Sequence, residues 1–250
     1  LSSGNLSPIG QGLKAFAVTS TDAAGNTSLP YTRNVTIDTV VPSSPTLSTV
    51  AGDNTINFAE AYAGVQISGT AEAGSAISVN IDGHAFTTTA TAGGIWVVPL
   101  SEYTVNTVIG QGAKPVTITS TDAAGNAKTV DAQSITVDTI APQSPMLAGV
   151  TVNQDGTATI SGISGIGDSL SVSIKGQNYT PVVNNGAWSV TMPANSVAAA
   201  GTALNTIVVT ATDAAGNKSA LNAQFTLASQ NPPTTTVSSV TLSADTGASA

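Results

Sequence analysis

The sequence contains no cysteine and a single histidine among its 250 residues. Without cysteine the chain can form neither a disulfide nor a thiolate metal site. A zinc or copper site is not expected either, because these metals are held mainly by cysteine sulfur and histidine nitrogen. A metal site in this chain is therefore expected to use oxygen ligands.

Charged residues are scarce as well. They make up 8% of the chain, whereas about 25% is typical of soluble proteins. Acidic residues outnumber basic ones 14 to 6, and the formal net charge is −8. This balance argues against nucleic acid as a partner, since phosphates require a basic surface, and it is compatible with the binding of cations. No apolar run reaches about 18 residues, so membrane insertion is not expected.

What the sequence does contain is a repeat. The hexapeptide TDAAGN occurs at Thr21–Asn26, Thr121–Asn126 and Thr212–Asn217. The match extends beyond the hexapeptide, because Ile9–Asn26 aligns with Ile109–Asn126 without a gap. The spacing between copies is the size of a domain, so each repeat is expected to have its own core.

Prolines near positions 42, 142 and 232 mark the joints between repeats. The sequence therefore predicts four segments. They are the second half of a repeat at 1–42, complete repeats at 43–141 and 142–230, and the start of a further repeat at 231–250. The incomplete repeats indicate that the chain is a piece of a longer array.

Each complete repeat is predicted to consist of short β-strands. Alternating runs rich in Val, Ile and Thr, such as AISVNID, VTITSTD and IVVTATD, are separated by turn residues. Asp82-Gly83 predicts a tight hairpin turn. About seven strands per repeat predict an all-β fold of tandem immunoglobulin-like sandwiches, in which Trp96 and Trp188 are core residues. No sustained helical period is present.

Several motifs follow one another in a fixed order: GTAEAGS at Gly69–Ser75, GIW at Gly94–Trp96, then TDAAGN, and VDTIAP at Val137–Pro142. With them the chain resembles the bacterial immunoglobulin-like repeats that build the stalks of giant secreted adhesins, which are usually exported by type I secretion systems. The resemblance covers nearly the whole chain. It implies an extracellular or cell-surface, monomeric rod with Ca²⁺ at the joints, and a role in cell adhesion and biofilm formation.

The same resemblance implies the partners of the chain. These are neighbouring repeats of the same chain, while a host-cell or surface receptor would be bound by other regions.

Acidic residues recur where such domains would meet. In an immunoglobulin-like sandwich the TDAAGN turn, the turn between the second and third strands, and the exit of the preceding domain are expected at one pole. The first set of candidate metal ligands is Asp38, Glu72 and Asp122, and the second is Asp138, Asp168 and Asp213. Carboxylates this close repel each other unless a cation lies between them, and Ca²⁺ takes six to eight oxygen ligands.

A second interpretation needs no metal. An aspartate that opens a tight turn can accept hydrogen bonds from the backbone ahead of it, and Gly-Asn can supply a positive φ. On this interpretation Asp22, whose preceding domain is absent, only forms a turn. The loop Gly52–Ala61, with Asp53, Asn57 and Glu60, is either a further source of calcium ligands or a solvated loop.

The sequence shows no constellation typical of an enzyme. His84 is the single histidine, and the next repeat has no equivalent of it, so a catalytic triad is not expected. Two alternatives to a stalk stay open. One repeat could itself bind a carbohydrate or receptor through Tyr62 or Tyr103, or the repeats could be accessory modules of a secreted polysaccharide-degrading enzyme.

Overall fold

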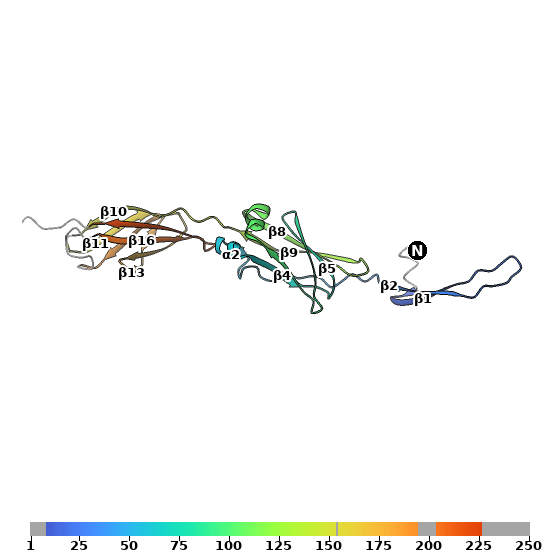
Figure 1. The fold of residues 1–250 in the computed structure, drawn as a ribbon. Coiled ribbons are helices and arrows are strands. Elements are labelled where there is room, and N and C mark those ends of the chain that lie inside the picture. Colours follow the sequence, from blue (N-terminus) through green and yellow to red (C-terminus); the bar gives the residue numbers. More distant parts are fainter. Residues whose placement is uncertain (1–8, 154, 195–203, 227–250) are drawn as a thin grey trace, which may run out of the picture. The chain divides into compact units, whose positions relative to one another are not determined.

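The computed structural model of the protein describes residues 9–153, 155–194 and 204–226. These residues form β-strands joined by turns and short helical segments (Figure 1), so the predicted all-β fold is confirmed. The chain divides into two compact units, Leu1–Ile140 and Ala141–Ala250. No helix in the described ranges is long and apolar enough to cross a bilayer. The division into four segments stays a prediction, and 231–250 lies outside the described residues.

The first unit begins with a β-hairpin. Strand β1 (Gly12–Val18) pairs antiparallel with β2 (Tyr31–Ile37), from Gly12 opposite Ile37 to Val18 opposite Tyr31. Val18 is 65% exposed. It aligns with Ile118, which is fully buried in the following sandwich. Within the described residues β1 and β2 pair only with each other, so the apolar face of this hairpin is open.

The rest of the first unit is a two-sheet sandwich. One sheet has the order β3-β9-β8-β5-β6 and the other pairs β4 with β7. The strands are β3 (Thr55–Ile56), β4 (Val65–Thr70), β5 (Ala76–Ile81), β6 (His84–Thr89), β7 (Ile95–Leu100), β8 (Gly112–Thr121) and β9 (Ala127–Val137). Every second residue of β5 is buried, namely Ile77, Val79 and Ile81, as a half-buried strand requires. These side chains pack with Ile67 and Val98 of the other sheet to form the core.

The second unit repeats this plan. Its sheets have the orders β10-β11-β15-β14 and β13-β12-β16-β17. The strands are β10 (Met146–Val152), β11 (Ala158–Ile163), β12 (Ser169–Ile174), β13 (Gln177–Tyr179), β14 (Val182–Asn184), β15 (Ala187–Met192), β16 (Asn205–Thr212) and β17 (Lys218–Phe225). Its core contains Ile160 and Trp188 from one sheet and Val172 and Ile207 from the other.

A tryptophan fills the centre of each sandwich, as predicted. Trp96 is 0% exposed and Trp188 is 2% exposed. Each ring lies over a glycine of the neighbouring strand, Gly69 in β4 and Gly162 in β11. A Cβ at either glycine would overlap both the indole ring and a backbone carbonyl oxygen. The repeated Ile-Ser-Gly sequence is therefore explained by close packing.

Two helical segments were not predicted from the sequence. Helix α2 (Phe58–Ala63) follows β3, and a π-helical turn, η2, spans Thr104–Ile109. The side chain of Asn57 accepts a hydrogen bond from the backbone of Glu60, and Glu60 reaches back to the backbone of Asn57. This reciprocal capping box begins a helix too short to show a period.

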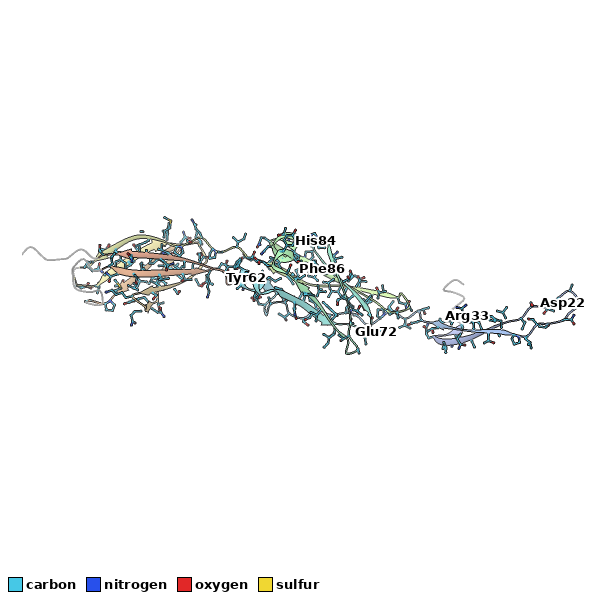
Figure 2. The ribbon with its side chains drawn as sticks, in the orientation of Figure 1. Asp22, Arg33, Tyr62, Glu72, His84 and Phe86 are labelled. Carbon is cyan, nitrogen blue, oxygen red and sulfur yellow. The ribbon has the colours of Figure 1, made fainter. Side chains whose placement is uncertain are left out.

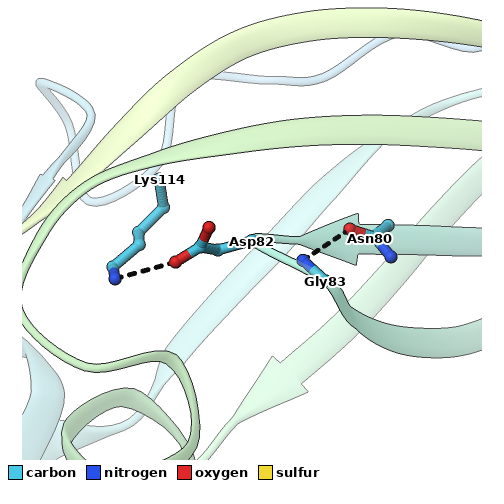
Figure 3. Close-up of polar contacts among 4 residues, drawn as sticks. All are labelled: Asn80, Asp82, Gly83 and Lys114. Carbon is cyan, nitrogen blue, oxygen red and sulfur yellow. Dashed lines mark hydrogen bonds and ion pairs between the residues drawn. The ribbon is translucent and has the colours of Figure 1, made fainter.

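The predicted hairpin turn at Asp82-Gly83 is present between β5 and β6. Both residues have positive φ, 51° and 90°, as a tight turn of this hand needs. Figure 3 shows the hydrogen bond from the Gly83 N–H to Asn80 Oδ1 and the ion pair from Lys114 Nζ to Asp82 Oδ2, at 2.9 and 3.0 Å. The turn is thus fixed to β8 as well as by its own residues.

Candidate functional site

The TDAAGN hexapeptide folds around the carboxylate of its aspartate. Between β8 and β9, Asp122 Oδ1 accepts hydrogen bonds from the backbone N–H groups of Ala124 and Asn126, each at 2.9 Å. Oδ2 accepts a third hydrogen bond from Asn126 Nδ2 at 2.8 Å. Gly125 has a φ of 93°, a conformation that favours glycine. The aspartate, glycine and asparagine are thus each needed for the turn.

The other two copies form the same turn. Asp22 and Asp213 each accept two backbone hydrogen bonds and one from the asparagine side chain, at 2.9–3.0 Å. Asp22 lies at the end of the first hairpin (Figure 2) and is exposed. The interpretation of the aspartate as a turn-forming residue is therefore confirmed in all three copies. Its role as a metal ligand stays a separate prediction.

The hydrogen bonds of the turn favour the charged form of the aspartate. The pKa of Asp122 lies below its ordinary value, chiefly because the side-chain amide of Asn126 donates to the carboxylate. The pKa of Asp22 is lowered mainly by the equivalent amide of Asn26. Both carboxylates are therefore ionised at neutral pH, which is the state in which a carboxylate binds a cation.

Three segments of the first predicted joint meet within the first unit. Asn126 Nδ2 donates a hydrogen bond to the backbone carbonyl of Asp38 at 3.2 Å. Glu72 Oε2 accepts one from the N–H of Ser43 at 3.3 Å. The linker that follows β2 therefore contacts both the TDAAGN turn and the turn between β4 and β5. The contact of Asn126 with Asp38 was not predicted from the sequence, and the recurrence of this asparagine in all three copies was the available signal.

The carboxylates at this joint are not gathered around one point. Asp38 Oδ1 accepts from the N–H of Val40 at 3.1 Å, and Glu72 is exposed on the surface of its unit (Figure 2). Across the described ranges, no group of three or more acidic or histidine side chains lies close enough to hold a metal ion. Asp38, Glu72 and Asp122 are each hydrogen-bonded to backbone amides instead, so their role as ligands stays a prediction.

The residues of the second predicted set belong to different units. Asp138 lies two residues before the end of the first unit, and its Oδ1 accepts a hydrogen bond from the N–H of Ile140 at 3.3 Å. Asp213 and Asp168 lie in the second unit. Asp168 Oδ2 is buried and accepts no hydrogen bond from the described residues. It lies so close over Gly165 that a Cβ there would overlap it. A buried carboxylate oxygen without a donor is costly unless a proton or a cation compensates it.

The acidic loop Gly52–Ala61 has a structural use. Asp53 Oδ1 accepts from the N–H of Thr55 at 2.8 Å, and Asn57 and Glu60 form the capping box of α2. The expectation of an irregular loop was wrong, because capping begins a helix there. The oxygens that suggested a calcium loop are used to fix the backbone.

Comparison with known proteins gives the following likenesses. No protein-family model matches the chain, and no curated protein matches it. The chain is 32% identical to the structure of a Ca²⁺-stabilized adhesin that helps an Antarctic bacterium bind ice, over 92% of this chain and 59% of that one, with a TM-score of 0.49. It therefore spans less than two thirds of that structure.

A second likeness is to a bacterial immunoglobulin-like domain from the ice-binding adhesin of M. primoryensis. The identity is 31%, the match covers 40% of this chain and 100% of that domain, and the TM-score is 0.31. A third structure, from a 1.5-MDa bacterial ice-binding adhesin, is 28% identical over 92% of this chain and 78% of that one, with a TM-score of 0.47. All three TM-scores lie below 0.5, so the likeness rests on sequence identity.

Proposed function

Because the chain belongs to the bacterial immunoglobulin-like domains of large adhesins, we propose that it is a segment of an adhesin stalk. The observation that carries this proposal is the 31% identity over the whole of one such domain. The stalk lies outside the cell or on its surface, and its immediate partners are the neighbouring repeats of the same chain. Its role is mechanical and not enzymatic: it holds an adhesive region away from the cell.

The architecture of the repeats suits a spacer. Each sandwich has its own buried core around one tryptophan, so a repeat can be added to an array without rebuilding its neighbours. The low fraction of charged residues leaves Thr, Ser, Asn and Gly to face the solvent. A surface of this kind supports a solvated stalk that is not itself adhesive.

Calcium at the joints is the second part of the proposal. Asp38, Glu72 and Asp122 would hold an ion at the first joint. Asp138, Asp168 and Asp213 are the residues proposed for the second. A bound Ca²⁺ would neutralise the negative charge of the carboxylates. Carboxylate and backbone carbonyl oxygens would together coordinate it. In this way it would fix one repeat to the next.

The donor chemistry fits calcium. The candidate ligands are all oxygens, the pKa of Asp122 is lowered, and Asp168 Oδ2 is buried with no hydrogen-bond donor among the described residues. At the first joint the hydrogen bonds of Asn126 and Ser43 already hold the backbone segments together. Binding would require the carboxylates of Asp38, Glu72 and Asp122 to approach one another, because they are not clustered in the described residues.

Chelation tests this proposal. The full chain is melted, and its X-ray scattering recorded, in calcium and in EDTA. We expect EDTA to lower the Tm and to broaden the distribution of particle dimensions, since an ion that binds only the folded chain stabilises it by linkage. An unchanged Tm together with an unchanged scattering profile would rule out calcium at the joints. The stalk assignment would survive that result.

One observation favours a second function. Phe58 and Tyr62 on α2 are stacked with ring centroids 6.3 Å apart and planes at 19°, and they are 51% and 73% exposed. Exposed, nearly parallel aromatic rings can stack on sugar rings. A glycan array probed with the chain and with Tyr62→Ala separates the two functions. Binding that is lost in the variant favours a carbohydrate module, and absence of binding favours a stalk.

A further inference from the structure

The linker that leaves the first sandwich begins with a side-chain clasp. Gln111 Oε1 accepts a hydrogen bond from the N–H of Thr139 at 3.0 Å, and Gln111 Nε2 donates to Thr139 Oγ1 at 2.7 Å. The Thr139 hydroxyl in turn donates to Asn106 Oδ1 of η2 at 2.7 Å. Thr139 is therefore held by three hydrogen bonds immediately after β9 ends.

The same clasp occurs one repeat earlier. Gln11 Oε1 accepts from the N–H of Thr39 at 2.9 Å, and Gln11 Nε2 donates to Thr39 Oγ1 at 2.6 Å. The glutamine and the threonine are 28 residues apart in both copies. The same pair of hydrogen bonds therefore occurs in two copies of the repeat, in different surroundings. The repeated Ile-Gly-Gln-Gly sequence, at Ile9–Gly12 and Ile109–Gly112, is thereby explained.

Strand register explains why the glutamine reaches the linker. Gly112 pairs with Val137, so the residue before Gly112 lies beside the residues that follow Val137. Gly110 and Gly112 have φ of 73° and 97°, conformations that side chains rarely adopt. Glycines on both sides of Gln111 thus turn the chain sharply as it enters β8. Both the oxygen and the nitrogen of the Gln111 side-chain amide then form hydrogen bonds with Thr139.

Three successive backbone N–H groups at the start of the linker are hydrogen-bonded, and the clasp binds the middle one. The N–H of Asp138 donates to Ile56 O at 3.0 Å, that of Thr139 to Gln111, and that of Ile140 to Asp138 Oδ1 at 3.3 Å. Pro142, two residues on, has a fixed φ. Asp138 and Thr139 are therefore fixed by the domain that they leave, and Ile140 is bonded to Asp138 within the linker.

We infer that Gln11 and Gln111 are positioning residues that fix the start of the linkers after β2 and β9 without calcium. They act on Thr39 and Thr139 and, through these, set the orientation of Asp38 and Asp138. The clasp itself does not depend on the proposed function. Its consequence for calcium does, because Asp38 and Asp138 are proposed ligands.

Amide hydrogen exchange in the full chain tests the clasp directly. Gln111→Ala removes both hydrogen bonds to Thr139, and Gln66→Ala, at an exposed position of β4, is the matched control. In EDTA we expect the Thr139 amide to exchange about tenfold faster in Gln111→Ala, the effect of losing one hydrogen bond of ordinary net strength. The control should leave it unchanged. Core amides such as that of Ile118 report whether the variant is still folded.

The outcomes separate the clasp from the calcium proposal. Unchanged protection of Thr139 in folded Gln111→Ala would overturn the clasp. Faster exchange in EDTA together with weaker calcium binding in a titration supports both the clasp and its link to Asp138. Faster exchange in a chain that takes up no calcium in any variant supports the clasp and contradicts calcium at the joints. Gln111→Glu, which keeps the acceptor and loses the donor, should show a smaller increase in exchange than Gln111→Ala.

Discussion

Asn126 donates one side-chain hydrogen bond to Asp38, 88 residues earlier in the sequence, at 3.2 Å. The same Nδ2 atom donates to Asp122 Oδ2 at 2.8 Å. A single amide therefore ties the linker to the turn that receives it. The TDAAGN turn therefore also contacts the linker at the first joint, a role that its turn geometry alone does not imply.

Replacement of this amide should weaken the first unit. Asn126→Ala loses the contacts to both Asp38 and Asp122, and we expect its Tm to fall by about 4 °C, the effect of about one hydrogen bond in a domain of this size. Asn26→Ala is the matched control, because Asn26 occupies the same turn in the first hairpin. Equal melting of the sandwich in the two variants would show that the contact with Asp38 contributes nothing.

Acid should destabilise the turns. The pKa of Asp122 is lowered in the folded chain from an ordinary value of 3.8, chiefly by the amide of Asn126. A lowered pKa stabilises the folded state above the unfolded pKa, and this contribution is lost as the pH falls through the folded pKa. The Tm of the wild type should therefore drop below about pH 4 more steeply than that of Asp122→Asn. Parallel acid profiles for the two proteins would contradict this assignment.

The glycines beneath the tryptophans should resist substitution. Gly162→Ala places a methyl group against Met146 O and the ring of Trp188, which we expect to cost about 3 kcal/mol of unfolding free energy. Gly149→Ala in β10 is the control, since no atom lies within 4 Å of its Cβ position and its φ is not positive. It should be neutral or slightly stabilising. Chemical denaturation measures both, and equal midpoints would show that Gly162 packs loosely.

The regular parts of the fold follow directly from the sequence. Alternation in AISVNID predicts β5, and Asp82-Gly83 predicts the turn after it, because both are set by residues adjacent in the chain. Repetition marks Trp96 and Trp188 as core residues, and burial confirms it. A pattern that occurs twice in different surroundings points to the shared fold and away from local function.

The missed features depend on contacts between distant residues. Gln111 reaches Thr139 only because strand pairing places them together, and Asn126 reaches Asp38 in the same way. Helix α2 was missed for a different reason. Six residues are too few for a helical period. Asn57 and Glu60 were expected to be either calcium ligands or residues of a solvated loop, and they form a capping box. Oxygen-rich side chains serve both purposes, and composition does not distinguish them.

Calcium titration by calorimetry shows directly whether the carboxylates of the first joint bind calcium. The wild-type chain is compared with the triple variant Asp38→Asn, Glu72→Gln, Asp122→Asn, and with Asp22→Asn as the control for the TDAAGN turn. We expect saturable uptake by the wild type, an unchanged isotherm in Asp22→Asn, and a reduced stoichiometry in the triple variant. No uptake by the wild type, or full uptake by a folded triple variant, would contradict calcium binding by these carboxylates.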